Sequence, residues 1–175
     1  MITQVQTVLL VICPALLIVA ALKDVTTYTI PNWISLALIV AFFPAALLLG
    51  LPFEGIGLHL GIGVAALVAG MVMFALGWIG GGDAKVFAAT ALWLGWPASA
   101  TFLLVTALAG GVLAMTLLAM RSMLLRRYVS TGPSWLSRLA EPGENVPYGL
   151  AICIGGLAAF PASTLVRAMA AAPPL

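Results

Sequence analysis

The chain has 175 residues, of which 63% are hydrophobic and 7% are charged, and its mean hydropathy is +1.20. An ordinary soluble domain has about 25% charged residues, so this composition excludes a water-soluble globule and predicts one membrane-embedded domain, residues 1–175, facing lipid. The net charge of +2 is better explained by membrane topology than by a nucleic-acid surface, and we expect no nucleic-acid partner.

Six apolar segments are candidates for transmembrane helices, because a hydrocarbon core about 30 Å thick needs about 20 apolar residues in a helix. They are residues 5–22, 33–49, 57–77, 84–96, 98–120 and 148–169. The first segment lacks the basic start of a signal peptide, so we expect it to be retained. The fourth is short and stops at Pro97; a tilted or re-entrant piece is an alternative, but we expect it to cross. The predicted fold class is therefore all-α, a polytopic transmembrane helix bundle of about six spans.

The basic residues predict how this bundle is oriented. If all six segments cross, residues 23–32, residues 78–83 and a polar loop at about 121–147 lie on one side of the membrane. Arg167 is then near the opposite face, and the other six basic residues share the first side: Lys23, Lys85, Arg121, Arg126, Arg127 and Arg138. The positive-inside rule assigns that side to the cytoplasm and places both termini outside.

Two acidic residues lie at membrane boundaries, where an ionisable side chain is by default a functional hypothesis. Asp24 ends the first segment, and Asp83 follows the third through Gly80, Gly81 and Gly82, so both emerge on the same predicted side. Two neighbouring carboxylates share a proton, which lets one act as a base toward water while the other donates to a carbonyl group. The pair therefore predicts the chemistry of an aspartic protease.

The sequence around Asp83 has a functional and a structural interpretation. The three preceding glycines permit close approach of a substrate strand, and a position at a helix N-terminus favours the ionised carboxylate, so we expect Asp83 to be the more acidic partner. The alternative is that the glycines and Asp83 form an ordinary turn and helix cap, and that Asp24 and Lys23 are a solvated pair at the membrane interface.

Other residues have simpler explanations. His59 stands alone near the opposite face, where we expect an interfacial position without a role, and Cys13 and Cys153 are expected to pack in apolar runs. With no cluster of carboxylates and histidines and no pair of closely spaced cysteines, we expect no metal site. Seven glycines suit close helix packing in lipid, and Gly57 and Gly61 among them have the typical spacing: Gly57, Gly61, Gly63, Gly110, Gly111, Gly155 and Gly156.

Three segments occur in order, each at a predicted boundary on the same side. They are Asp24 with Ile30-Pro31-Asn32, then Gly80-Gly81-Gly82-Asp83-Ala84-Lys85, then Val146-Pro147-Tyr148-Gly149-Leu150-Ala151-Ile152. In this combination the chain resembles, over nearly its whole length, the type IV prepilin peptidases, a family of Gly-x-Gly-Asp membrane aspartic proteases. The resemblance implies that Asp24 and Asp83 are the catalytic pair. It also suggests an active-site loop or substrate-positioning role for Gly80, Gly81, Gly82, Lys85, Pro31, Asn32, Pro147 and Tyr148.

The resemblance also implies an activity. A multi-pass protein of the bacterial inner membrane would remove the leader peptide from prepilin or pseudopilin precursors at the cytoplasmic face, for pilus biogenesis or protein secretion. Its partners would be these precursors and membrane lipid, and it would need no cofactor. The chain is similar to the short TadV- or CpaA-like form of the tight-adherence and Flp pilus systems. Because nothing matches the cysteine-rich segment of the long N-methylating members, we expect no methyltransferase activity.

Two other classes of function compete with this one. A small proton-coupled membrane transporter also needs membrane carboxylates, but transport sites lie near the midplane on broken helices, often between repeated halves. Asp24 and Asp83 end helices instead, and the sequence contains no evident repeat. A noncatalytic pilus-assembly subunit would use glycine-faced helices to hold partners, and it leaves the two aspartates unexplained.

Overall fold

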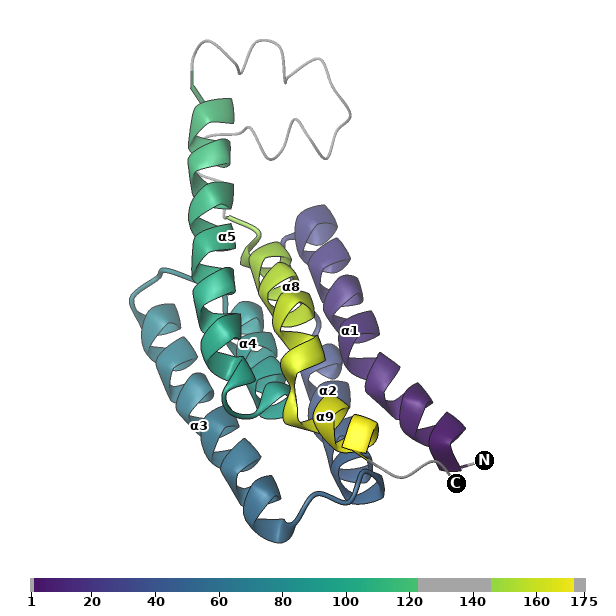
Figure 1. Cartoon of the computed structure of the whole chain (residues 1–175). Helices are drawn as coiled ribbons and strands as arrows, with labels where there is room; N and C mark the ends of the chain where they lie inside the picture. Colours follow the sequence, from purple (N-terminus) through teal and green to yellow (C-terminus); the bar gives the residue numbers. More distant parts are fainter. Residues whose placement is uncertain (1, 123–145, 172–175) are drawn as a thin grey trace.

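The computed structural model describes residues 2–122 and 146–171, which form helices and contain no β-strand (Figure 1). The elements are α1 (Ile2–Thr27), α2 (Asn32–Leu48), α3 (Phe53–Ala75), α4 (Gly81–Leu94), α5 (Ala98–Met120), α8 (Tyr148–Ala159), the 3-10 turn η1 (Phe160–Ala162) and α9 (Thr164–Ala171). Each of the six segments predicted from hydropathy overlaps helical structure, and the all-α bundle is confirmed. Most of the predicted loop at about 121–147 lies outside the described residues, as do Arg126, Arg127 and Arg138.

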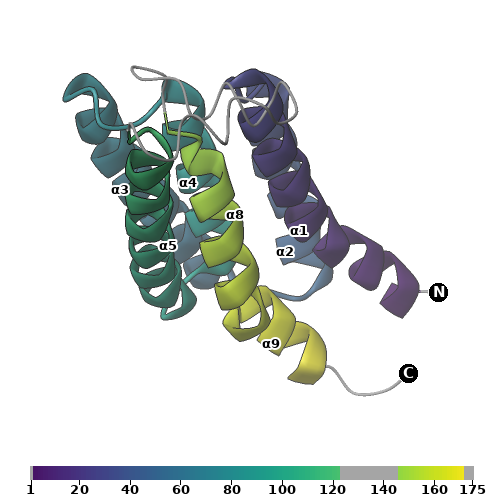
Figure 2. The same cartoon turned by 90° about the horizontal axis from the view of Figure 1, so that it is seen from above.

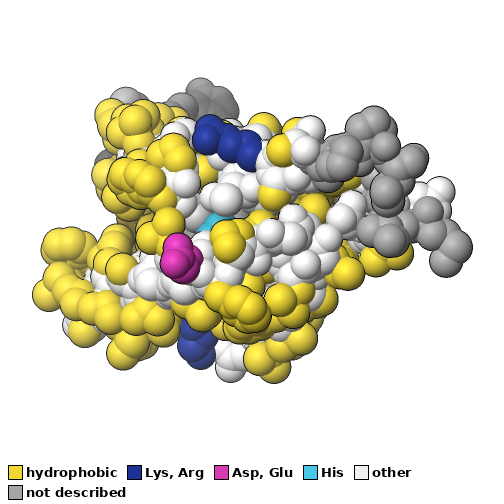
Figure 3. Space-filling view, turned by 60° about the horizontal axis from the view of Figure 1, so that its bottom comes forward, with side chains coloured by type: hydrophobic (Ala, Val, Ile, Leu, Met, Phe, Trp, Pro, Cys, Tyr) yellow, Lys and Arg dark blue, Asp and Glu magenta, His cyan; other side chains and the backbone are white. Residues whose placement is uncertain are grey.

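The outer surface of the bundle identifies a membrane protein. Within the described residues, four helical stretches are long and apolar enough to cross a bilayer, and α2 is a shorter apolar helix. On α5, Met115 and Leu118 leave 73% and 68% of their surface uncovered. Figure 3 shows how largely hydrophobic one face of the molecule is, with isolated charged side chains. Apolar area of this extent is stable against lipid and not against water. The four stretches are Gln4–Thr27, Phe53–Ala75, Ala98–Met120 and Tyr148–Ala171.

Helix α4 is the short central element. It has 14 residues, which corresponds to about 21 Å, less than the hydrocarbon core of about 30 Å. Most of its side chains are buried, and it contacts α2, α3 and α8. Viewed from above, α4 and α8 lie between the side formed by α1 and α2 and the side formed by α3 and α5 (Figure 2). The predicted segment 84–96 thus begins earlier, at Gly81, and its complete crossing stays a prediction.

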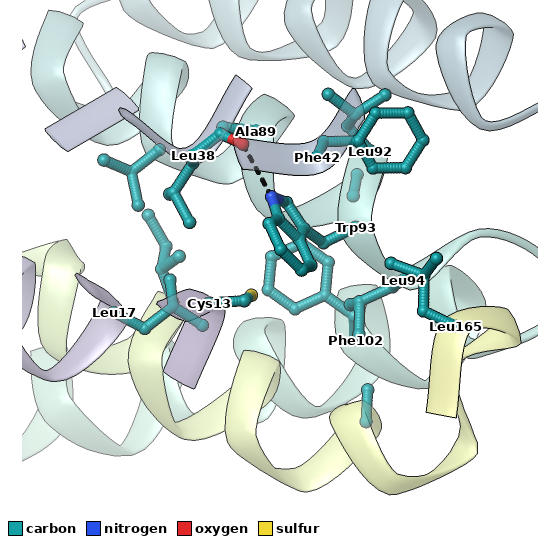
Figure 4. Packing of buried hydrophobic residues seen from close by; sticks show 14 of the residues in the cluster. Cys13, Leu17, Leu38, Phe42, Ala89, Leu92, Trp93, Leu94, Phe102 and Leu165 are labelled. Atoms are coloured by element: carbon teal, nitrogen blue, oxygen red, sulfur yellow. Dashed lines mark hydrogen bonds between the residues drawn. The ribbon is translucent and has the colours of Figure 1, made fainter. Parts of the chain in front are cut away.

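Trp93 anchors α4 in the core. Its indole Nε1 donates a hydrogen bond of 2.8 Å to the carbonyl oxygen of Leu38 in α2. Its ring meets Phe42 edge-on, with ring centroids 6.2 Å apart. Figure 4 shows Cys13 of α1 and Phe102 of α5 in the same cluster. This packing fixes α4 against its neighbours, and therefore also fixes the side chains at its other end.

Of the three α3 glycines predicted to pack closely, Gly63 does so within the described chain, and Gly57 and Gly61 do not. An added Cβ at Gly57 or Gly61 would meet nothing within 4 Å, so these residues make no close helix contact within the described chain. The contact lies on Gly63 and Gly70, where a Cβ would come within 3.1 Å of the Cβ atoms of Leu92 and Ala84 in α4. The spacing of Gly57 and Gly61 is typical of close helix packing, but spacing alone does not identify the face of α3 that contacts α4.

The ends of the bundle differ in charge. Helix α1 ends, and α2, α4 and α8 begin, at the end that is uppermost in Figure 1. Glu54 in the first turn of α3 and Arg167 in α9 lie at the opposite end. Of the charged residues that the structure describes, the uppermost end holds the rest: Lys23, Asp24, Asp83, Lys85 and Arg121.

Candidate active site

Asp24 and Asp83 converge on one backbone amide. Asp24 lies in the last turn of α1 and Asp83 in the first turn of α4, and only 5% and 6% of their surfaces are exposed. The N–H of Gly149 in α8 donates a 2.7 Å hydrogen bond to Oδ2 of Asp24. The same amide also interacts with the carboxylate of Asp83 and lowers its pKa, although burial and the charge of Asp24 raise that pKa by more. Three helix ends therefore enclose the two carboxylates.

Burial and the neighbouring charge of Asp24 determine the pKa of Asp83. Burial and, to a smaller extent, the negative charge of Asp24 raise the pKa of Asp83 to about 7, although the amides of Gly80 and Gly149 oppose the rise. The prediction that Asp83 is the more acidic partner rested on its position at a helix N-terminus, but desolvation outweighs that effect and raises the pKa of Asp83. Asp83 instead has a carboxyl group that retains its proton close to neutral pH.

Asp83 is held through one of its two oxygens. It is the third residue of α4, and its Oδ2 accepts a 3.0 Å hydrogen bond from the N–H of Gly80, the residue before the helix. Its Oδ1 is buried and has no hydrogen-bond partner among the described residues. A buried oxygen of this kind is costly unless something pairs with it. Oδ1 is thus available to water or to a substrate carbonyl.

Glycine is required where the three helix ends meet. A Cβ on Gly149 would lie 2.8 Å from Oδ2 and 2.9 Å from Cβ of Asp24. A Cβ on Gly82 would lie 3.0 Å from Cβ of Ile30, and one on Gly80 would lie 2.9 Å from Oδ2 of Asp83. Close approach of helix ends within the chain therefore explains why these positions are glycine. Contact of Gly80, Gly81 and Gly82 with a substrate strand stays a prediction.

Gly149 and Ile30 are site residues to which sequence reasoning assigned no role. Both belong to the three ordered segments, yet neither carries a group that reacts. Ile30 packs beside both Gly82 and Gly149, so it fills the space between α4 and α8. The available signal was a glycine directly after Pro147 and Tyr148 at a membrane boundary, where a small residue favours close backbone approach.

Lys85 and Asn32 are brought together, on the outer side of α4. The Nζ of Lys85 donates a 2.8 Å hydrogen bond to Oδ1 of Asn32, and both side chains are exposed. Residues two positions apart point to different sides of a helix, and Lys85 is exposed where Asp83 is buried. The pair therefore links the beginnings of α2 and α4 without facing the carboxylates directly.

The prolines and Tyr148 shape the helix ends. Pro31 directly precedes α2, and the fully buried Pro147 directly precedes α8. The ring of Tyr148 packs near Gly110 of α5, where an added Cβ would lie 3.4 Å from the ring. Tyr148 also lines a pocket of about 360 Å³ with residues of α5 and of the segment before α4. None of these contacts joins Pro31, Pro147 or Tyr148 to the carboxylates.

His59 and the cysteines lie apart from this site. His59 was predicted to be interfacial, but it is buried. Its Nδ1 lies 2.6 Å from the carbonyl oxygen of Leu92, and its ring packs on Phe42. Cys13 and Cys153 are free and buried, so their predicted packing is confirmed.

Over residues 2–122 and 146–171, no group of three or more His, Cys, Asp or Glu side chains is placed to hold a metal ion.

Together, the fold and the site define a polytopic helical membrane protein with a buried pair of carboxylates at one end of its bundle. A model of the type IV leader peptidase family matches residues 11–115, and the chain belongs to this family. The matched range contains both Asp24 and Asp83 and ends before α8. The family implies prepilin-type substrates and confirms the resemblance. No curated protein and no solved structure matches the chain significantly.

Proposed function

We propose that this chain is an aspartic endopeptidase that removes the leader peptide of prepilins, with Asp24 and Asp83 as its catalytic residues. The observation that carries the proposal is the burial of both carboxylates around the N–H of Gly149. Keeping two acidic groups in such a place costs folding free energy, which favours a functional reason for them. Family membership supplies the class of substrate.

In the proposed mechanism the pair carries one proton, which is held by Asp83, whose pKa is raised to about 7. Asp24 takes a proton from water, and the water oxygen forms a bond to the scissile carbonyl carbon. The carbonyl oxygen receives the electron pair of its double bond and takes the proton from Asp83. When the C–N bond breaks, Asp24 returns a proton to the leaving amine, and a hydroxyl proton of the intermediate returns to Asp83.

The proposal places this reaction at the cytoplasmic face of the bacterial inner membrane. Lys23, Lys85 and Arg121 lie at the same end of the bundle as the carboxylates, and basic residues favour the cytoplasmic side. A leader that stays in the cytoplasm would meet the site there. The similarity of the chain to the short peptidases of Flp pilus systems favours Flp-type prepilins as the substrates.

A cleavage assay with purified protein tests the proposal. A prepilin precursor reconstituted in the same vesicles is incubated with the parent protein and with Asp24→Asn and Asp83→Asn, and the mass of the new N-terminus is measured. We expect each substitution to lower the rate by at least about 10³-fold, because removing a member of an acid–base pair removes that catalytic route. Glu54→Gln, which changes a carboxylate at the opposite end, is the control and should retain the parent rate. Undiminished cleavage by either Asn variant contradicts the assignment.

The alternative functions have less support. A proton-coupled transporter is expected to have its carboxylates near the midplane, whereas Asp24 and Asp83 lie at helix ends. A noncatalytic assembly subunit has no use for two buried carboxylates. The mass measurement also separates these alternatives from the enzyme, and it detects any N-methylation of the product, which we expect to be absent.

A further inference from the structure

A long apolar groove runs along the outside of the bundle between α2, α3 and α4. Its volume is about 710 Å³, against about 360 Å³ for the pocket beside Tyr148. Four small residues of α4 line it: Gly81, Ala84, Ala88 and Ala89. Larger apolar side chains of α2 and α3 line it on either side, among them Leu36, Ile39, Val64, Leu67 and Met71.

The groove is open to the surrounding membrane. Leu36 of α2 and Val64 of α3 both line it and both leave more than half of their surface uncovered. The stretch of α4 from Gly81 to Leu92 lines its length, which corresponds to about 17 Å, or three helical turns. An apolar segment could therefore enter sideways from the bilayer and lie along α4.

One end of the groove is polar and lies at the end of α4 that carries Asp83. Asn32, Ser35 and Lys85 line it, and all three belong to the first turns of α2 or α4. Asp83 belongs to the same turn of α4 as Lys85, but it is buried on another side of the helix. Helix α4 thus connects the groove to the candidate active site at the end where Asp24 also lies.

We propose that this groove binds the apolar transmembrane helix of the prepilin substrate. The inference rests on the proposed function and specifies where the substrate is held. Small residues such as Ala84 and Ala88 let a second helix approach α4 closely, which is how helices pack in lipid. A helix seated there has its N-terminal end beside Lys85, so the preceding extended junction passes over the beginning of α4 toward Asp83.

The polar end suits that junction. Lys85 has three N–H donors, and Asn32 Oδ1 accepts one of them at 2.8 Å. An unfolded peptide segment leaving the membrane has unpaired backbone carbonyl groups, which need donors in a place with little water. Lys85 therefore positions the junction, whereas the apolar length of the groove binds the helix.

Two valines of α3 provide a matched test. Val64 lines the groove and Val68 does not, although they lie one turn apart and are 60% and 56% exposed. In Val64→Trp the indole occupies the groove, and we expect cleavage of membrane-inserted prepilin at low substrate concentration to fall about tenfold, the usual effect of overpacking a contact. We expect Val68→Trp to stay within about twofold of the parent, as surface substitutions do.

Photo-crosslinking gives a second readout that does not depend on catalysis. A photoreactive amino acid is placed at position 64 or 68 of the Asp83→Asn protein in vesicles with tagged prepilin. We expect a prepilin adduct from position 64 and little from position 68. Equal adducts from both positions, or adducts with lipid alone at position 64, overturn the groove assignment. If the parent protein cleaves no prepilin, the proposed function fails by itself, and the adducts still decide whether the groove binds the helix.

Discussion

The N–H of Gly149 lies 2.7 Å from Oδ2 of Asp24, although 125 positions separate the two residues in the chain. This hydrogen bond joins the beginning of α8 to the end of α1, at the point where α4 presents Asp83. The contact requires a residue without a side chain, because a Cβ on Gly149 would overlap Asp24. A backbone group and a glycine thus determine the geometry of the carboxylate pair.

Gly149→Ala is expected to impair cleavage much more than folding. The added methyl group would lie 2.9 Å from Cβ of Asp24 and 3.0 Å from Cδ1 of Ile30, so α8 must move away and the hydrogen bond must lengthen. We expect the cleavage rate to fall about 100-fold, since a displacement of about 1 Å at a reacting group has an effect of this size. The rate at saturating prepilin measures it.

Gly57→Ala is the matched control for this substitution. A Cβ at Gly57 meets nothing within 4 Å, and alanine favours a helix over glycine by about 1 kcal/mol. We therefore expect the control to cleave at the parent rate and to unfold at an equal or higher temperature. Parent-like cleavage by Gly149→Ala would show that the Gly149–Asp24 contact does not matter for the reaction.

The pH dependence of cleavage follows from the proton on Asp83. Because burial and the charge of Asp24 raise the pKa of Asp83 to about 7, the pair loses its shared proton as the pH rises through this value. We expect the rate to decline above about pH 7, with the slope of a single proton. Initial rates across pH 5 to 9, in vesicles of constant composition, measure the decline. A rate that stays level to pH 9 would mean that Asp83 is not the proton donor.

Stability should depend on the same proton with a definite sign. The pKa of Asp83 is raised from 3.8 to about 7 in the folded protein, so the folded state binds the proton more tightly than the unfolded state. The resulting stabilisation is fully present below pH 3.8 and is lost as the pH rises to about 7. Asp83→Asn cannot ionise and keeps an oxygen for the Gly80 amide, so it should avoid this loss.

We therefore expect the thermal unfolding midpoint of Asp83→Asn to exceed that of the parent at pH 8 and to approach it at pH 4. Scans in one detergent at both pH values give the comparison. Glu54→Gln, at an exposed position at the other end, should show no such pH-dependent difference. A parent protein that equals or exceeds Asp83→Asn at pH 8 would mean that ionisation of Asp83 costs no stability.

The sequence predicts the bundle well because the bilayer imposes simple rules on length and apolarity. The same rules predict that Asp24 and Asp83 share one end, since helices alternate in direction. They do not predict the limits of α4, whose burial depends on its neighbours, or the contact of Gly149 with Asp24, which spans most of the chain. They also miss the pKa of Asp83, because desolvation depends on the packed helices around it.

Lys85→Met is expected to weaken substrate binding while leaving the carboxylate pair intact. Lys85 is exposed and donates to Asn32 on the outer side of α4, so its loss should leave Asp83 buried and bonded to Gly80. We expect the prepilin concentration for half-maximal rate to rise about three- to tenfold with little change in the maximal rate, the effect of losing about 1 kcal/mol of binding. Lys23→Met, an exposed lysine at the same end, should change neither quantity. If Lys85→Met instead lowers the maximal rate as far as Asp83→Asn does, then Lys85 acts in the chemical step and its positioning role is wrong.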